Sequence, residues 1–235
     1  MKTDFTTGIP EIDRLTGSSI KNGSFLLAAG NDDEGMLSFL AEIENINERH
    51  AGKEKNGLDG CRIVKMISET SENRDNFCRL FGDEKKEDGD NQNLIIIIES
   101  ISEWVASEFH SKEKRPEEQN EEQETIRWIR KIRSFLKTES NDELKHGARK
   151  ESRKMIVIGL LHENIFSIGT ENRIKHLSDS YFRFTAEEKG TQLERTICIY
   201  KYNDGEHKGG DISGKILKYN LEDGKIRIET KKRIY

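Results

Sequence analysis

The chemistry that this sequence offers is concentrated where a strand-like run meets a helix-like segment. The apolar run 25–29 ends at Gly30, and Gly35 follows five residues later and opens a segment with helical spacing. Glycines at these positions in a strand, loop and helix are the frame of a phosphate-binding loop, Gly-x-x-x-x-Gly-Lys-Ser/Thr. In a working loop, backbone N–H groups cradle phosphate, the lysine neutralises it and the hydroxyl group holds magnesium. Here Met36 stands at the lysine position and Leu37 at the hydroxyl position.

Three acidic residues, Asp32, Asp33 and Glu34, follow Asn31 in the middle of this loop. They place negative charge where a triphosphate would lie, and two like charges about 4 Å apart repel by roughly 4 kcal/mol at an effective dielectric near 20. The same carboxylates suit a helix N-terminus, whose unpaired N–H groups attract an anion. We expect one of them to accept a hydrogen bond from an N–H group of residues 35–37, as a built-in substitute for phosphate. The alternative is an ordinary acidic turn before a helix.

Composition and charge argue against several other functions. The 235 residues fit one large domain. The net charge of −5 argues against DNA or an anionic membrane as the main partner, because such partners bind basic surfaces. Cys61, Cys78 and Cys198 are isolated, and no histidine pair has metal-site spacing, so neither a disulfide framework nor a metal site is predicted. The N-terminus lacks a signal-type apolar region, and the longest apolar run, 94–98, is too short to span a bilayer. We therefore expect a cytoplasmic protein.

Apolar periodicity predicts strands that alternate with helices. Strands are predicted over 24–29, 62–68, 94–98 and 155–161, and helices over 37–47, 76–81, 101–109 and 125–136. This order favours an α/β fold, with a mainly parallel sheet and helices on both faces. Short strands over 181–184, 196–202, 216–220 and 225–230, the last two joined by a hairpin, predict an antiparallel C-terminal β-extension from about residue 195. We expect a single domain over 1–235, with a polar insertion around 110–124 whose acidic residues form a solvated loop or helix face.

Several short motifs in these segments resemble those of the KaiC-like branch of the RecA superfamily. Residues 7–17 are similar to that family's opening Thr-Gly-Ile-Pro-Glu-Leu-Asp-Arg-Leu-Leu-Gly-Gly, and residues 29–31 are similar to its Ser-Gly-Asn at the loop. Residues 174–179 resemble its Ile-Glu-His-Leu-Ala-Asp before a strand. The resemblance runs nearly end to end and implies a RecA-like P-loop NTPase fold, in a family of ATPases that form hexamers or filaments.

The resemblance also implies where active-site positions would lie. Glu99 matches the Walker-B-type Asp that ends the third strand, and Glu69 matches one of the paired acids after the second strand. Lys201 and His207 match a neighbour-facing Lys-x-Arg-Gly-Thr-x-His segment whose middle positions are not kept. We interpret Glu69, Glu99 and Lys201 as vestigial active-site positions, with strand-end caps or a surface ion pair as the alternative. At the end of the fourth strand, where related ATPases keep polar sensor residues, we interpret His162 and Glu163 as packing or surface groups.

The sequence therefore predicts a catalytically inactive pseudo-ATPase with no bound ATP or magnesium. We expect it to act as a regulatory or scaffolding subunit, in signal transduction, through contacts with an active RecA-like ATPase or with a second copy of itself. One alternative is an atypical ATPase that still binds nucleotide weakly. Another is a recombinase-type paralogue that assists an active partner on DNA. The negative net charge and the absence of a sequence pattern for an aromatic, basic groove argue against this alternative.

Overall fold

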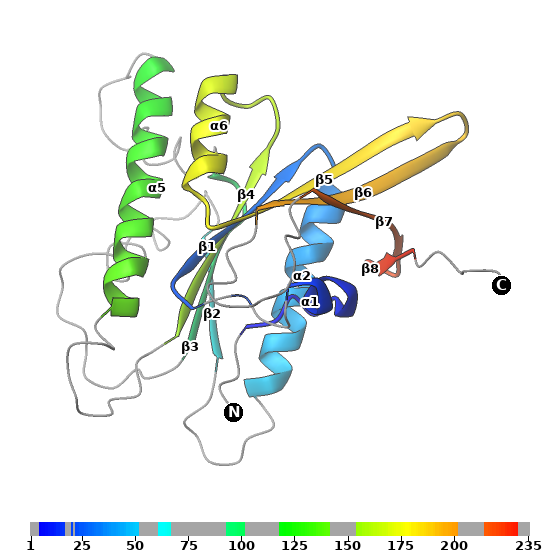
Figure 1. Ribbon diagram of the computed structural model, residues 1–235, viewed down its shortest axis with the longest axis horizontal. Helices are drawn as coiled ribbons and strands as arrows, with labels where there is room; N and C mark the ends of the chain where they lie inside the picture. Colours follow the sequence, from blue (N-terminus) through cyan, green and yellow to red (C-terminus); the bar gives the residue numbers. More distant parts are fainter. Residues whose placement is uncertain are drawn as a thin grey trace.

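In the part of the chain that the computed structural model describes, five parallel strands and three antiparallel strands form one continuous sheet (Figure 1). The structure describes residues 5–16, 20, 22–51, 61–66, 93–101, 118–141, 154–201 and 214–229. Within these residues the strand order is β2-β3-β4-β1-β5-β6-β7-β8. The strands are β1 (Ser24–Gly30), β2 (Cys61–Met66), β3 (Asn93–Ile98), β4 (Met155–His162), β5 (Ser180–Lys189), β6 (Gln192–Lys201), β7 (Lys215–Glu222) and β8 (Lys225–Ile228).

The parallel half of the sheet runs from β2 to β5. Its central strands β1, β3 and β4 are buried along nearly their whole lengths, which is why their sequences are continuously apolar. Gly30 and His162 are Cα partners, so the carboxyl ends of β1 and β4 lie at one edge of the sheet. The residue after β3, Glu99, lies at the same edge. The predicted α/β class with a mainly parallel sheet is confirmed.

Helices cover both faces of the sheet. Helices α1 (Pro10–Leu15) and α2 (Asp33–Ala51) pack on one face, and α5 (Glu118–Asn141) and α6 (Ile168–Leu177) pack on the other. Side chains of β1 alternate between the two cores: Leu26 and Ala28 join the first, and Phe25 and Leu27 join the second. The predicted apolar stripe of α5 is buried as expected, at Ile126, Ile129, Ile132 and Leu136. None of the described helices is long and apolar enough to cross a membrane.

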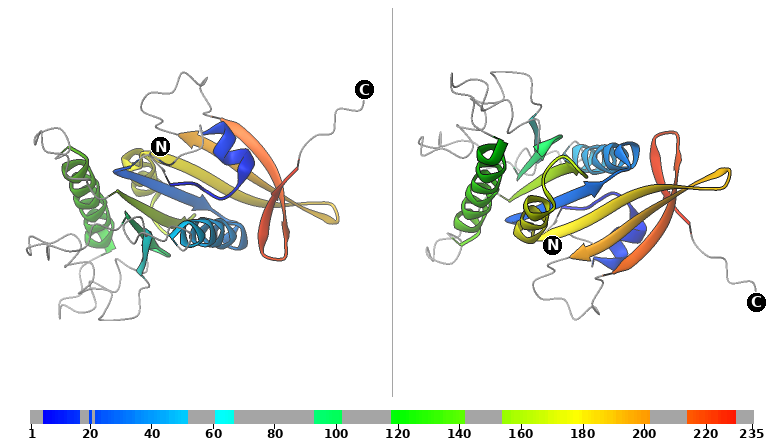
Figure 2. Two further views of the ribbon diagram at one scale, coloured as in Figure 1. Left: turned by 90° about the horizontal axis from the view of Figure 1, so that it is seen from below. Right: turned by 90° about the horizontal axis from the view of Figure 1, so that it is seen from above.

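The C-terminal part of the chain continues the sheet with antiparallel strands. Strand β6 pairs with β5, β7 with β6, and β8 with β7. The β7–β8 hairpin turns at Asp223 and Gly224, whose φ angles of 52° and 71° are those that a two-residue hairpin turn requires. This confirms the predicted hairpin. Strand β5 is longer than the predicted 181–184, and these strands project away from α5 at the opposite end of the molecule (Figure 2).

The two cores differ in how far they extend along the sheet. The α1 and α2 core reaches from β3 to β8, where it includes Tyr219 and Ile226. The α5 and α6 core ends at β5 with Tyr181. Consequently the described helices leave one face of β6 and β7 uncovered. Tyr200 and Ile216 on that face are 46% and 65% exposed.

Two helices begin earlier than the sequence predicts. Helix α2 begins at Asp33 rather than at Leu37, and α5 begins at Glu118 rather than at Thr125. Residues 118–124 of the predicted polar insertion therefore form the first turns of α5. Both helices start at acidic residues, whose charges favour the positive end of a helix dipole. The helix predicted over 76–81, and most of the one predicted over 101–109, lie outside the described residues.

Candidate functional site

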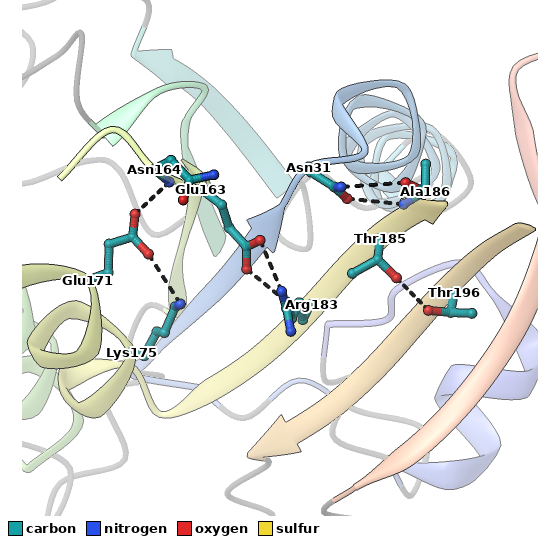
Figure 3. Close-up of polar contacts among 9 residues, drawn as sticks. All are labelled: Asn31, Glu163, Asn164, Glu171, Lys175, Arg183, Thr185, Ala186 and Thr196. Atoms are coloured by element: carbon teal, nitrogen blue, oxygen red, sulfur yellow. Dashed lines mark hydrogen bonds and ion pairs between the residues drawn. The ribbon is translucent and has the colours of Figure 1, made fainter. Parts of the chain in front are cut away.

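Only two residues, Asn31 and Asp32, join β1 to α2 at the candidate phosphate loop. The side chain of Asn31 holds this turn against β5, because its Oδ1 accepts a hydrogen bond from Ala186 N–H at 3.0 Å and its Nδ2 donates to Ala186 O at 3.4 Å (Figure 3). A Cβ atom at Gly30, whose φ is +154°, would lie 1.7 Å from Phe184 O. The strand therefore has to end in glycine for the turn to pack against β5.

Asp32 caps α2 and is almost completely buried, with 3% of its surface exposed. Its Oδ1 accepts a hydrogen bond from Gly35 N–H at 3.0 Å, and its backbone carbonyl accepts one from Met36 N–H at 2.9 Å. These are the bonds of an N-cap residue, so the helix begins directly after Asp32. The predicted hydrogen bond between an acidic side chain of the loop and a backbone N–H group is confirmed. The early start of α2 has the same cause.

Two residues of the antiparallel strands close over Asp32. Arg195 on β6 donates from Nε to Asp32 Oδ2 at 3.2 Å, and Tyr219 on β7 donates from Oη to the same oxygen at 2.5 Å. Arg195 also donates from Nη2 to Glu34 Oε2 at 2.5 Å. Burial raises the pKa of Tyr219, and the hydrogen bond to the Asp32 carboxylate raises it further, so the hydroxyl group stays protonated and donates.

The contact of Tyr219 with Asp32 requires glycine at position 35. A Cβ atom at Gly35 would lie 1.8 Å from Tyr219 Oη and 2.9 Å from Asp32 Oδ2. Such distances leave no room for a side chain, so Gly35 has to be glycine for Tyr219 to reach Asp32. The spacing of Gly30 and Gly35 that resembles a phosphate loop therefore serves two close contacts within the protein.

The two positions that replace lysine and the hydroxyl residue face different environments. Met36 is fully buried in the α2 core, whereas the side chain of Leu37 is 53% exposed. Asp33 lies at the surface, and its Oδ1 is 2.7 Å from Nδ1 of His162 at the end of β4. Neither a thioether nor an aliphatic side chain supplies a positive charge or a metal ligand of the kind that magnesium prefers.

Glu99 and Lys201, the two of the predicted vestigial positions that the structure describes, lie apart. Glu99 lies at the same sheet edge as the turn, with its Oε1 3.9 Å from Lys65 Nζ, which is itself 2.9 Å from Glu44 Oε2. Lys201 pairs with Tyr181 at the start of β5, away from the carboxyl ends of the parallel strands. Its Nζ donates to the carbonyl oxygens of His176, at 3.2 Å, and Ser178, and thereby caps the end of α6. Burial lowers the pKa of Lys201. Glu69 and His207 lie outside the described residues.

Glu163, for which a packing or surface role was predicted, forms a partly buried ion pair with Arg183. Its carboxylate accepts hydrogen bonds from Arg183 Nε at 2.8 Å and Nη2 at 3.1 Å (Figure 3). These bonds raise the pKa of Arg183, and burial opposes the shift in part. Nearby, Glu171 accepts from Asn164 N–H at 2.8 Å and from Lys175 Nζ at 3.4 Å. Within the described ranges, no group of three or more His, Cys, Asp or Glu residues could hold a metal ion.

Sequence reasoning missed Arg195 and Tyr219. A signal for Arg195 was present, because it occupies the same side of β6 as the buried Ile197 and Ile199. A charged residue at an inward position of a strand needs a buried partner. The identity of that partner, Asp32, could not be obtained without the pairing of β6 with β5 and β7.

Comparisons with known proteins support the architecture. No family model and no curated protein matches the sequence. Among solved structures, the KaiC-like protein PH0186 from Pyrococcus horikoshii OT3 is similar at 15% identity and a TM-score of 0.55, over 97% of this chain and 99% of that one. The flagellar accessory protein FlaH from Methanocaldococcus jannaschii is similar at 12% identity and a TM-score of 0.52, over 94% and 95% of the two chains.

These likenesses define the fold. The chain has a RecA-like α/β fold, and the resemblance to KaiC-like proteins that the sequence indicated is confirmed at the level of architecture. The coverage of nearly the full length of both neighbours includes the antiparallel strands as well as the parallel ones. Identities this low carry no statement about activity.

Proposed function

We propose that this protein is a non-catalytic RecA-like domain, a pseudo-ATPase that acts as a regulatory or scaffolding subunit through protein contacts. One observation carries the proposal. The carboxylate of Asp32 accepts a hydrogen bond from Gly35 N–H at the helix N-terminus, where a phosphate-binding loop would hold its phosphate. Arg195 and Tyr219 donate hydrogen bonds to the other oxygen of the same carboxylate.

Loss of phosphate and metal binding is sufficient to end hydrolysis. Phosphoryl transfer depends on holding the phosphate and the metal in place before any base can act on water. A nucleotide entering this loop would have to displace a buried carboxylate from a half-buried arginine and a buried tyrosine. Separating one partner from a buried ion pair costs about 3 to 5 kcal/mol. Glu99 keeps a negative charge at the sheet edge, but nothing beside it in the turn would hold the phosphate.

The uncovered face of β6 and β7 supports a function through protein contacts. Cys198 and Ile216 are Cα partners on the two strands, and Tyr200 lies two residues beyond Cys198 on the same face. Exposed tyrosine and isoleucine side chains on one face of a sheet are typical of the centre of a protein interface. We propose that the partner is an active RecA-like ATPase or a second copy of this chain, in a cytoplasmic signalling assembly.

Co-purification tests the proposed partner. Wild-type protein used as bait in native extract should retain an active RecA-like ATPase, or form homo-oligomers in size-exclusion chromatography with light scattering. Ile216→Asp should abolish the association, because it places a charge in the apolar face. The matched control is Leu193→Asp, which changes another exposed apolar residue, near the tip of the β5–β6 hairpin. Association that survives Ile216→Asp, or hydrolysis of ATP above background by the purified protein, would contradict the proposal.

A further inference from the structure

The C-terminal strands hold the strand–helix turn through a small polar cluster, which we call the latch: Asp32, Glu34, Arg195 and Tyr219. Arg195 and Tyr219 are Cα partners on β6 and β7, so their side chains leave the sheet side by side. They meet Asp32 across 163 and 187 residues of sequence. The two strands and the turn are therefore joined by contacts that form only when both are in place.

The centre of the latch is shielded from water. Asp32 is 3% exposed and Tyr219 is 1% exposed, and the side chain of Arg195 is 19% exposed. Asp32 has a donor for each oxygen: Gly35 N–H for Oδ1, and Arg195 Nε with Tyr219 Oη for Oδ2. Because buried hydrogen bonds and ion pairs are screened little by solvent, breaking one of them weakens the others.

Apolar packing reinforces the same connection. Tyr219 lies in the core beneath α2, with its ring 6.3 Å from that of Phe184 in an edge-to-face arrangement. Ile226 of β8 belongs to the same core. The hydroxyl of Tyr219 reaches Asp32 only because Gly35 has no side chain. Shape and hydrogen bonding therefore both fix the docked position of β7 against the turn.

We propose that the latch is a conformational coupling contact that joins the C-terminal β-extension, β6 to β8, to the first turn of α2, so that the two open and close as one unit. In the docked state the extension keeps the turn closed on its own carboxylate. The two equilibria are linked. A ligand or a substitution that destabilises the docked position of the extension therefore destabilises the closed conformation of the turn by the same coupling free energy. This proposal goes beyond the proposed function, since it concerns how the closed turn is maintained and would hold for an active or an inactive protein.

Amide hydrogen exchange on the full chain tests the coupling from both sides. Tyr219→Phe removes one hydroxyl group and keeps the ring, so the variant should fold. We expect the amides of Gly35 and Met36 to exchange at least about tenfold faster in this variant, together with amides of β7. Asp32→Asn, made in the turn, should in return accelerate exchange in β7 by a similar factor. Amides of β4, which report global opening, should change less than either region.

A control and a contrary result make the test decisive. Lys218→Gln alters the neighbouring residue of β7, whose side chain points to the opposite face and contacts Glu194. It should leave the exchange of Gly35 and Met36 unchanged. The proposal is overturned if Tyr219→Phe accelerates exchange within β7 alone, or if all amides, including those of β4, accelerate equally. If Asp32→Asn does not fold, Tyr219→Phe still decides the question.

Discussion

Two helix N-termini in this protein are capped by carboxylates from the chain itself, in different surroundings. At α2, Asp32 is buried and is held by Arg195 and Tyr219 from distant strands. At α6, Glu122 of α5 reaches the N-terminus, where its oxygens accept hydrogen bonds from Ser167 N–H at 2.6 Å, Ser167 Oγ at 2.7 Å and Thr170 Oγ1 at 2.5 Å. The second site lies at the surface.

The comparison indicates that burial, more than the capping hydrogen bonds themselves, determines how much each carboxylate contributes to stability. Both carboxylates satisfy N–H groups that a helix leaves unpaired. The α6 cap is solvated, so it contributes only modestly to the packing of α5 against α6. The α2 cap is desolvated and has two further donors, so it links α2, β6 and β7.

The largest effect should come from removing the buried carboxylate. Asp32→Ala leaves Gly35 N–H and Tyr219 Oη without their acceptor and leaves Arg195 with Glu34 alone. We expect it to lower the free energy of unfolding by about 3 kcal/mol. Urea denaturation measures this. Asp33→Ala is the matched control, because the Asp33 side chain is 65% exposed and should cost less than about 1 kcal/mol. Equal losses for the two variants would show that the buried contact has no special weight.

Restoring the two missing groups of the phosphate loop should have the next largest effect. Met36→Lys places an ammonium group in the α2 core and should destabilise the protein by about 2 kcal/mol or more. Leu37→Thr alters a half-exposed side chain and should cost less than about 1 kcal/mol. Neither single change nor the pair should create ATP hydrolysis, since Asp32 still fills the turn. Thermal melting and a phosphate-release assay check both statements, and an unchanged midpoint with new activity in the pair would refute them.

The solvated cap should show the smallest effect, and that effect should depend on pH. Hydrogen bonds from Thr170 and Ser167 lower the pKa of Glu122 below its ordinary value of 4.5. A lowered pKa in the folded state means that the stabilisation is complete above the ordinary value and is lost as the pH falls through the lowered one. Glu122→Gln should therefore cost about 0.5 kcal/mol at pH 7, and the cost should shrink as the pH falls through the lowered pKa of Glu122.

The control for this comparison lies on the same helix. Glu124→Gln removes a carboxylate whose partner is Arg127 of α5 rather than a helix N-terminus. It should change the free energy of unfolding by less than about 0.3 kcal/mol at pH 7. A stability difference for Glu122→Gln that stays constant as the pH is lowered would mean that the side chain acts through packing instead of charge.

Features that depend on local pattern were predictable from the sequence, and features that depend on distant partners were not. The continuous apolarity of β1, β3 and β4 predicted the parallel sheet, and the Asp223-Gly224 pair predicted the β7–β8 hairpin. The carboxylate at the N-terminus of α2 followed from helix chemistry alone. The hydrogen bonds from Arg195 and Tyr219 to this carboxylate depend on which strands become neighbours. The hydrogen bonds of Glu122 at the N-terminus of α6 likewise depend on the packing of α5 beside α6. Periodicity carries no such information.

One titration tests the central claim most directly, namely that Asp32 takes the place of a nucleotide phosphate. Purified wild-type protein is titrated with ATP in excess magnesium and followed by calorimetry, beside a working RecA-like ATPase under the same conditions. The account predicts no binding tighter than about millimolar, because the turn offers neither lysine nor hydroxyl and is occupied by its own carboxylate. Micromolar binding to the wild-type protein would contradict it.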